Sequence, residues 1–163
     1  MILHLSTFHL EGGAGVAATR LHRALLHGGI NSKMLIPIIH QAEQGVTPLA
    51  ETVWQKRKSW LRFVGERLSF LPNEKDSSVR FAFSPADIGT DISQHPLVQQ
   101  ADIIHLHWIN FGFLSLNSLR KLFALGKPVV WTLHDMWAFT GGCHYSRGCN
   151  HYLTHCHQCP YLS

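Results

Sequence analysis

Short apolar runs alternate with segments of helical periodicity along this chain, and this alternation limits the available folds more than any other feature. The apolar runs that we expect to form strands are residues 2–6, 32–36, 79–83, 103–108 and 129–133. The segments that we expect to form helices are residues 16–27, 54–71, 96–100 and 115–125. Residues 37–52 are predicted to form a loop. Strands that alternate with crossover helices predict a parallel sheet in an α/β layer fold.

Length and composition favour one folded domain. The chain has 163 residues, of which 45% are hydrophobic and 15% charged, so it can bury a core and is too apolar to be disordered. We therefore interpret residues 1–163 as a single domain, with a cysteine- and histidine-rich loop at 136–163. Lysine and arginine number 14 against 10 acidic residues and form no basic block. Nucleic acid is therefore not an expected partner.

Two segments bear on the cellular location. Met1 leads into residues 2–5 without the basic flank and long apolar stretch of a secretory signal, and no apolar run approaches a membrane span. We expect a cytoplasmic protein. Within 54–71, basic residues such as Lys56, Arg57 and Lys58 alternate with apolar ones. This pattern is typical of the solvated face of an amphipathic helix, or of a helix lying on an anionic membrane surface.

A glycine-rich loop follows the first predicted strand, with glycine at positions 12, 13 and 15. Glycines there let the backbone approach a ligand, and a helix N-terminus offers free N–H groups to an anion. A simple strand-to-helix turn is the alternative. Residues 13–18 also satisfy a dinucleotide-binding fingerprint, but the carboxylate expected at the end of the second strand is missing, which disfavours a nicotinamide enzyme. A phosphate-binding P-loop is excluded because no lysine and hydroxyl pair follows the glycines.

Histidines stand at the ends of two later predicted strands. Alternation along 103–108 puts His105 and His107 on one side of the strand, and His134 follows the run at 129–133. Ligands of parallel α/β sheets bind beyond the carboxyl ends of the strands. Imidazole can hydrogen-bond sugar hydroxyls or phosphate and exchange a proton near neutral pH. A purely structural role for these histidines remains the alternative.

Cysteines are confined to the carboxyl-terminal loop. Cys143, Cys149, Cys156 and Cys159 have the spacing C-x5-C-x6-C-x2-C, which suits a tetrahedral structural zinc site. Free thiols, a redox pair and disulfides remain alternatives, and a nearby histidine could replace one cysteine. A catalytic zinc is disfavoured because four thiolates leave no open position.

Together these motifs resemble glycosyltransferase family 4, in particular the bacterial exopolysaccharide and colanic-acid-type enzymes. The segments that carry the resemblance are Gly12-Gly13-Ala14, residues 20–25, residues 101–108 (ADIIHLHW), residues 127–137 (KPVVWTLHDMW) and residues 139–145 (FTGGCHY). The combination covers the chain nearly from end to end, and only residues 40–100 are featureless in this comparison.

The resemblance implies the amino-terminal, acceptor-side half of a GT-B enzyme, with a Rossmann-like parallel sheet flanked by helices. Such enzymes retain anomeric configuration and need no divalent metal for chemistry. The resemblance places Gly12, Gly13 and Ala14 against phosphate of the donor or acceptor. It makes His134 the catalytic residue near the transferred sugar. The residues implied on the acceptor side are His105, His107 and Asp135.

The resemblance also implies the partners: a nucleotide-sugar donor, and a glycan or lipid-linked sugar acceptor at the inner face of the membrane. We therefore expect a transferase of polysaccharide or glycoconjugate biosynthesis. Because the family's E-x7-E carboxylates and nucleotide pocket are missing, we expect this chain to be inactive by itself. The alternative is a non-catalytic, zinc-stabilised α/β binding module. Sugar transfer further requires Gly13 and His134 to lie on the same face of the sheet.

Overall fold

The computed structural model describes residues 1–163 and contains one five-stranded sheet with the strand order β3-β2-β1-β4-β5. The strands are β1 (Ile2–Leu5), β2 (Ser32–Ile36), β3 (Val46–Pro48), β4 (Ile103–Leu106) and β5 (Val129–Trp131). The helices are α1 (Gly12–His27), α2 (Val53–Phe70), α3 (Pro96–Gln100) and α4 (Leu116–Phe123). All neighbouring strands are parallel. This confirms the predicted Rossmann-like α/β fold.

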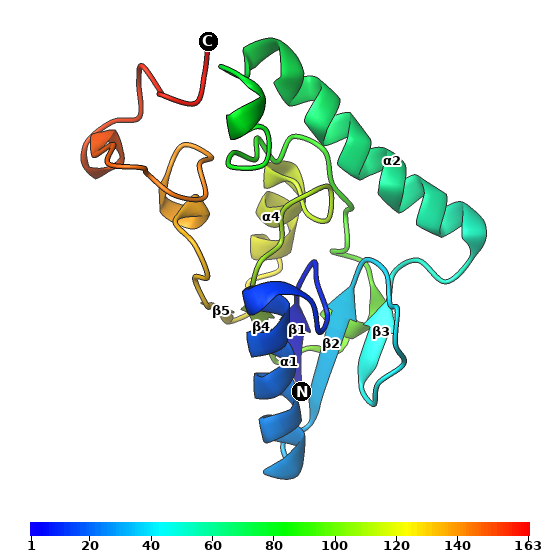
Figure 1. Cartoon of the computed structure of the whole chain (residues 1–163). Coiled ribbons are helices and arrows are strands. Elements are labelled where there is room, and N and C mark those ends of the chain that lie inside the picture. The colour runs from blue at the N-terminus through cyan, green and yellow to red at the C-terminus, as the bar shows by residue number, and fades with distance from the viewer.

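The two faces of the sheet differ in what covers them. On one face, side chains of β1, β2 and β4 join α3, α4 and the loops between them in a core cluster of 15 buried residues. On the opposite face, Ala18 of α1 packs with Met34 and Ile36 of β2, and Figure 1 shows α1 running across the sheet. This second face carries His4, which is level with Met34 on one side and with His105 on the other. The histidines therefore lie on the α1 face.

Two local predictions were wrong. Residues 46–48, placed in a loop, form β3, which pairs with the outer edge of β2. Three residues ending in Pro48 show no period-2 pattern, so only the free edge of β2 reveals them as a strand. Residues 79–83, predicted as a strand, follow a 3-10 helix at Ser77–Val79 that Asp76 caps through the amide of Ser78. Only Phe83 makes a bridge, to Cys143.

The carboxyl-terminal segment packs beside the end of α2 rather than on the sheet (Figure 1). It contains only two 3-10 helices, Trp137–Phe139 and His151–Leu153. A small cluster joins it to the region after α2, and its members are Phe70, Val79, Phe83, Cys143 and Tyr161. The amide of Lys75 also donates to the carbonyl of Tyr161 at 3.1 Å. The segment therefore depends on few buried side chains.

None of the helices combines the length and the apolar character needed to cross a membrane.

Candidate functional site

The candidate site lies at the carboxyl-terminal edge of the sheet, where β1, β4 and β5 end. Because the strands are parallel, the glycine loop after β1, His107 after β4 and His134 after β5 are delivered to this one edge. The strand order makes β1, β4 and β5 successive neighbours, so the three segments are adjacent. The sequence-based prediction that strand-terminal histidines meet is therefore confirmed for His107 and His134.

The glycines at 12, 13 and 15, expected in a loop before the helix, instead form the first turn of α1, because the helix begins at Gly12. This turn, still called the glycine loop below, is open to solvent at its start and tightly packed at Gly15. Gly12 has a φ of +61°, in the left-handed region that favours glycine. A Cβ on Gly13 would meet no atom within 4 Å, whereas a Cβ on Gly15 would lie 3.0 Å from the Cβ of Phe8 and 3.1 Å from its backbone. No side chain caps α1. The first amides of α1 are therefore free to bind an anion.

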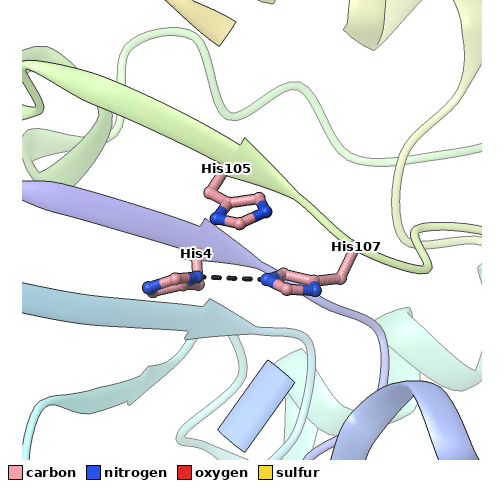
Figure 2. A group of neighbouring side chains, drawn as sticks. All are labelled: His4, His105 and His107. Carbon is pink, nitrogen blue, oxygen red and sulfur yellow. Dashed lines mark hydrogen bonds between the residues drawn. The ribbon is translucent and has the colours of Figure 1, made fainter. Parts of the chain in front are cut away.

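Three histidines form a hydrogen-bonded chain at this edge. Nδ1 of His4 lies 3.1 Å from Nε2 of His107, and Nδ1 of His107 lies 3.1 Å from Nε2 of His134. His105 stacks on His107 with ring centroids 4.4 Å apart and bonds Thr132 through Nε2. Figure 2 shows His4 and His107 meeting nitrogen to nitrogen, with His105 alongside. The imidazole chain, defined as His4, His107 and His134, thus begins inside the sheet and ends at the site.

Burial and mutual repulsion keep this group neutral. Burial lowers the pKa of His4 to about 3, with further lowering by His105 and His22. Burial also lowers the pKa of His107 to about 3, with further lowering by His105, His4 and His134. The pKa of His134 is lowered by burial as well, although Asp135 opposes the shift. Near pH 7 the chain is therefore made of neutral imidazoles, each with one N–H and one acceptor nitrogen.

In a series of hydrogen-bonded neutral imidazoles, each ring donates through one nitrogen and accepts through the other, so all the hydrogen bonds must run in the same direction. If His134 accepts from His107, then His107 accepts from His4, and Nδ1 of His134 carries the hydrogen. In the opposite pattern His134 donates and its Nδ1 is a lone pair. Nδ1 of His134 makes no hydrogen bond to another group of the protein. At the other end of the imidazole chain, Nε2 of His4 is buried without a hydrogen-bond partner. The tautomer of His134 is therefore coupled to that of the buried His4.

The histidines His4, His105 and His107 offer ligand atoms that all lie within 4.8 Å of one another, which raises the question of a metal. The ring planes are tilted by 36° between His4 and His105, by 35° between His4 and His107 and by 24° between His105 and His107. His4 and His107 already share a proton, and His105 is bonded to Thr132. A proton-sharing chain accounts for this group better than a metal centre.

Asp135 holds the segment after β5 in place. Its Oδ2 accepts from the indole of Trp108 at 2.7 Å and bonds Nδ1 of His144 at 2.6 Å, and its Oδ1 accepts from the amide of Trp137. Burial raises the pKa of this carboxyl, but the hydrogen bonds from His144, Trp137 and Trp108 outweigh burial and lower it. The Asp135 side chain is 11% exposed. The carboxylate therefore makes its hydrogen bonds to other groups of the protein, and these bonds position the neighbouring His134.

A continuous series of contacts connects the glycine loop with Asp135. Gly15 packs on Phe8, and the Phe8 ring stacks on Trp108 with centroids 5.3 Å apart and an angle of 17°. Trp108 in turn donates to Asp135. Because His134 bonds to His107 on the α1 face, the glycine loop and His134 lie on the same face of the sheet. The condition that Gly13 and His134 share one face of the sheet is therefore met, while the hollow beside His134 is lined by none of the glycines.

Sequence reasoning missed two parts of this region. It treated the run at 2–6 as plain strand and overlooked His4, although a histidine in period-2 register with the strand interior was a usable signal. It also missed an open groove of about 400 Å³ between the sheet edge and α2, whose aromatic walls are Phe8, Trp60, Phe63 and Phe111. No linear pattern joins these four residues. By contrast, the hollow beside His134 is only about 10 Å³.

The four cysteines lie away from the histidines. All are free thiols, and all four line one cavity of about 100 Å³ in the carboxyl-terminal segment.

Comparison with known proteins agrees with this geometry. The profile of Glycosyltransferase Family 4 matches residues 11–158. One curated relative, the putative colanic acid biosynthesis glycosyl transferase WcaC of Escherichia coli (strain K12), is 35% identical over 71 residues. That match covers 42% of this chain and 17% of the relative, so the chain corresponds to a minor part of that protein. No solved structure matches the chain. Since the family profile spans nearly the whole sequence, the chain belongs to glycosyltransferase family 4.

Proposed function

We propose that this chain is the acceptor-side part of a glycosyltransferase that moves a sugar from a nucleotide sugar to a glycan or lipid-linked acceptor in polysaccharide biosynthesis. The observation that carries the proposal is the placement of an uncapped helix N-terminus and the half-buried imidazole of His134 on one face and edge of the sheet. Family membership supports the reaction class. Retention of anomeric configuration is part of the proposal and follows from the family alone.

The glycine loop would bind phosphate. Gly12 and Gly13 are exposed, and the space around Gly13 is empty, so a diphosphate can approach the first amides of α1. The imidazole of His134 would act on the sugar hydroxyls. Its free Nδ1 either donates a hydrogen bond or accepts one, according to the proton pattern in the imidazole chain. His4 and His107 are positioning residues because they act through His134.

The aromatic groove between the sheet edge and α2 suits an acceptor. Sugar rings and isoprenoid chains both pack against aromatic faces, and Trp60 is 57% exposed there. The hollow of about 10 Å³ beside His134 holds no more than about one water molecule. A donor sugar therefore needs an opposing wall to hold it and exclude water, and we propose that a donor-binding domain supplies that wall. We expect no transfer by this chain alone.

Titration with UDP-glucose, followed by amide and imidazole chemical shifts, tests the proposal. We expect the signals of Gly13 and His134 to move together, with weak affinity because only one wall is present. Gly13→Val should weaken binding about tenfold or more because it fills the approach to the amides. The matched control is Ala17→Val, at an exposed position of the same helix.

The outcomes separate the alternatives. Shifts that avoid both Gly13 and His134, or a Gly13→Val variant that binds like wild type, would contradict the phosphate assignment. NAD serves as a second probe: saturable binding of NAD with no response to UDP-glucose would support a nicotinamide enzyme instead. No response to either ligand would favour a binding module without a nucleotide site.

The exposed face of α2 supports membrane contact as part of this function. Trp54, Leu61 and Leu68 recur every seven residues along the helix and are 77%, 52% and 60% exposed. Arg57 and Lys58 lie between Trp54 and Leu61 on the same surface. Apolar side chains flanked by basic ones fit an anionic bilayer surface, where a lipid-linked acceptor would be found.

Vesicle sedimentation measures this contact. We expect the chain to sediment with phosphatidylglycerol-containing vesicles and much less with pure phosphatidylcholine, and salt should weaken the association. Replacing both Trp54 and Leu61 by serine should reduce the bound fraction severalfold. Leu153→Ser, which removes a leucine outside α2 that is 70% exposed, is the control. Equal loss in the control, or self-association of the chain without vesicle binding, would refute membrane contact through α2.

A further inference from the structure

One cavity in the carboxyl-terminal segment brings together all four cysteines of the chain. Cys143, Cys149, Cys156 and Cys159 line it, and its volume is about 100 Å³. This exceeds the roughly 10–15 Å³ needed for a single bound water. The cavity lies outside the imidazole chain and the glycine loop, so the proposed transfer function makes no use of it.

The backbone around the cavity is shaped for close approach of the cysteines. Cys156 and Cys159 flank a tight turn in which Gln158 has a φ of +46°. A Cβ on Gly141 would lie 3.1 Å from the Cβ of Cys156 and 3.4 Å from its sulfur, so glycine at this position lets the backbone pass close to that side chain. Gly142, with a φ of +129°, lets the chain press on the ring of Phe83 and places Cys143 in the wall.

Two imidazoles share the cavity wall with the thiols. Nδ1 of His151 and of His157 bonds a backbone carbonyl, of His157 and His155 respectively, at 2.8 Å, which leaves Nε2 of each as a potential ligand. No carboxylate lines the cavity. Its donor set is therefore soft and rich in sulfur, which is the set that zinc prefers.

We propose that Cys143, Cys149, Cys156 and Cys159 form a structural zinc site in which the four thiolates bind one Zn²⁺ tetrahedrally. Zn²⁺ displaces one proton from each thiol, four protons pass to solvent, and the resulting complex carries a charge of −2. Zinc–sulfur bonds of about 2.3 Å place the sulfurs roughly 3.8 Å apart. No three of the thiols lie within 4.8 Å of one another, so binding zinc requires the sulfurs to move closer together.

A zinc ion here would stabilise the segment that completes the candidate site. The start of the segment is held by Trp137, which joins the main core, whereas the part that follows has only the small cluster around Phe70 and Tyr161 and the buried His144. His144 follows Cys143 directly and bonds Asp135, the residue next to His134. The site would thus fasten the loop that positions Asp135. Four thiolates leave no open coordination position, so the ion would be structural rather than catalytic.

Metal analysis of the full 163-residue chain, purified without a chelator and without a histidine tag, tests the proposal. We expect about one zinc per chain, released when a mercurial reagent modifies the thiols. Cobalt(II) in place of zinc should give sulfur-to-cobalt charge transfer and the intense visible bands of tetrahedral coordination. Cys156→Ser and Cys159→Ser should lose the bound zinc, whereas Ser146→Ala, in the same cavity wall, should keep it.

Each outcome bears on the site. Folded wild-type protein that stays metal-free in zinc-containing buffer would overturn the proposal, and so would octahedral cobalt spectra. Full retention of zinc in Cys156→Ser and Cys159→Ser would also overturn it. If the cysteine variants do not fold, the cobalt spectrum and mercurial release on wild type still decide. Loss of zinc in His157→Gln, with retention in one cysteine variant, would exclude the four-thiolate set.

Discussion

Acidification from pH 7 to pH 5 is expected to lower the free energy of unfolding of this chain by about 4 kcal/mol. His4 and His107 have pKa values of about 3 in the fold, against an ordinary value of 6.5. Between those values the unfolded chain binds more protons than the folded chain, so stability rises with pH and falls as the pH drops below 6.5. Between pH 7 and pH 5, each of the two histidines lowers the free energy of unfolding by about 2 kcal/mol, which is a large share of the stability of a small domain.

Urea denaturation at a series of pH values measures this effect. His4→Leu removes one of the two imidazoles, so the loss between pH 7 and pH 5 should shrink by about half. Exposed His27 lies at the end of α1, and His27→Asn is the control that should leave the pH dependence unchanged. Because both variants retain all four cysteines, acid release of zinc cannot produce the difference between them. A wild-type stability that is flat from pH 7 to pH 5 would contradict the neutral imidazole chain.

Glu66→Ala is expected to destabilise the chain by about 3–5 kcal/mol. Glu66 is fully buried on α2, where its carboxylate accepts from the guanidinium of Arg67 at 2.8 Å and from the amide of Gly112. Burial raises the pKa of Glu66, although Arg67 and the amide of Gly112 counter the shift. Removing the carboxylate leaves the buried Arg67 without a counter-ion. The loss should therefore exceed that of an ordinary hydrogen bond.

Chemical denaturation of matched variants checks this prediction. Glu51→Ala, at an exposed position just before α2, should change the free energy of unfolding by no more than about 0.5 kcal/mol. Replacing Glu66 and Arg67 together by leucine and methionine should cost less than the sum of the single changes, because neither charge is then stranded. A loss below about 1 kcal/mol for Glu66→Ala would mean that water reaches Arg67 and that the pair does little to hold α2.

Some of the candidate site could be predicted from the sequence because its signals are local. The glycines after β1 and the histidines after β4 and β5 sit next to their strands in the sequence, and parallel strands deliver such residues to one edge. The signal of the four cysteines is local as well, because all four lie within residues 143–159 and form a recognisable spacing pattern. The prediction missed β3 because a three-residue edge strand is specified by its partner β2 and by no pattern of its own.

The links between these residues could not be predicted, because they depend on which strands are neighbours and in what register. His4 reaches His107 only because β1 pairs with β4, with His4 level with His105. The aromatic groove likewise draws its walls from four separate stretches of chain, and Asp135 owes two of its hydrogen bonds to Trp108 and His144. Side-chain contacts of this kind arise from packing across long sequence separations.

The sequence by itself therefore determined the α/β class, the parallel sheet and the chemical groups gathered at its edge. It could do so because periodicity and position at a strand end depend only on residues that are close together in the sequence. The tertiary structure alone decided that the buried His4 is linked through His107 to the half-buried His134, that Asp135 is hydrogen-bonded within the protein, and that four cysteines line one cavity. The physical reason is that hydrogen bonds and ring contacts act over a few ångströms in space, whatever the distance along the chain.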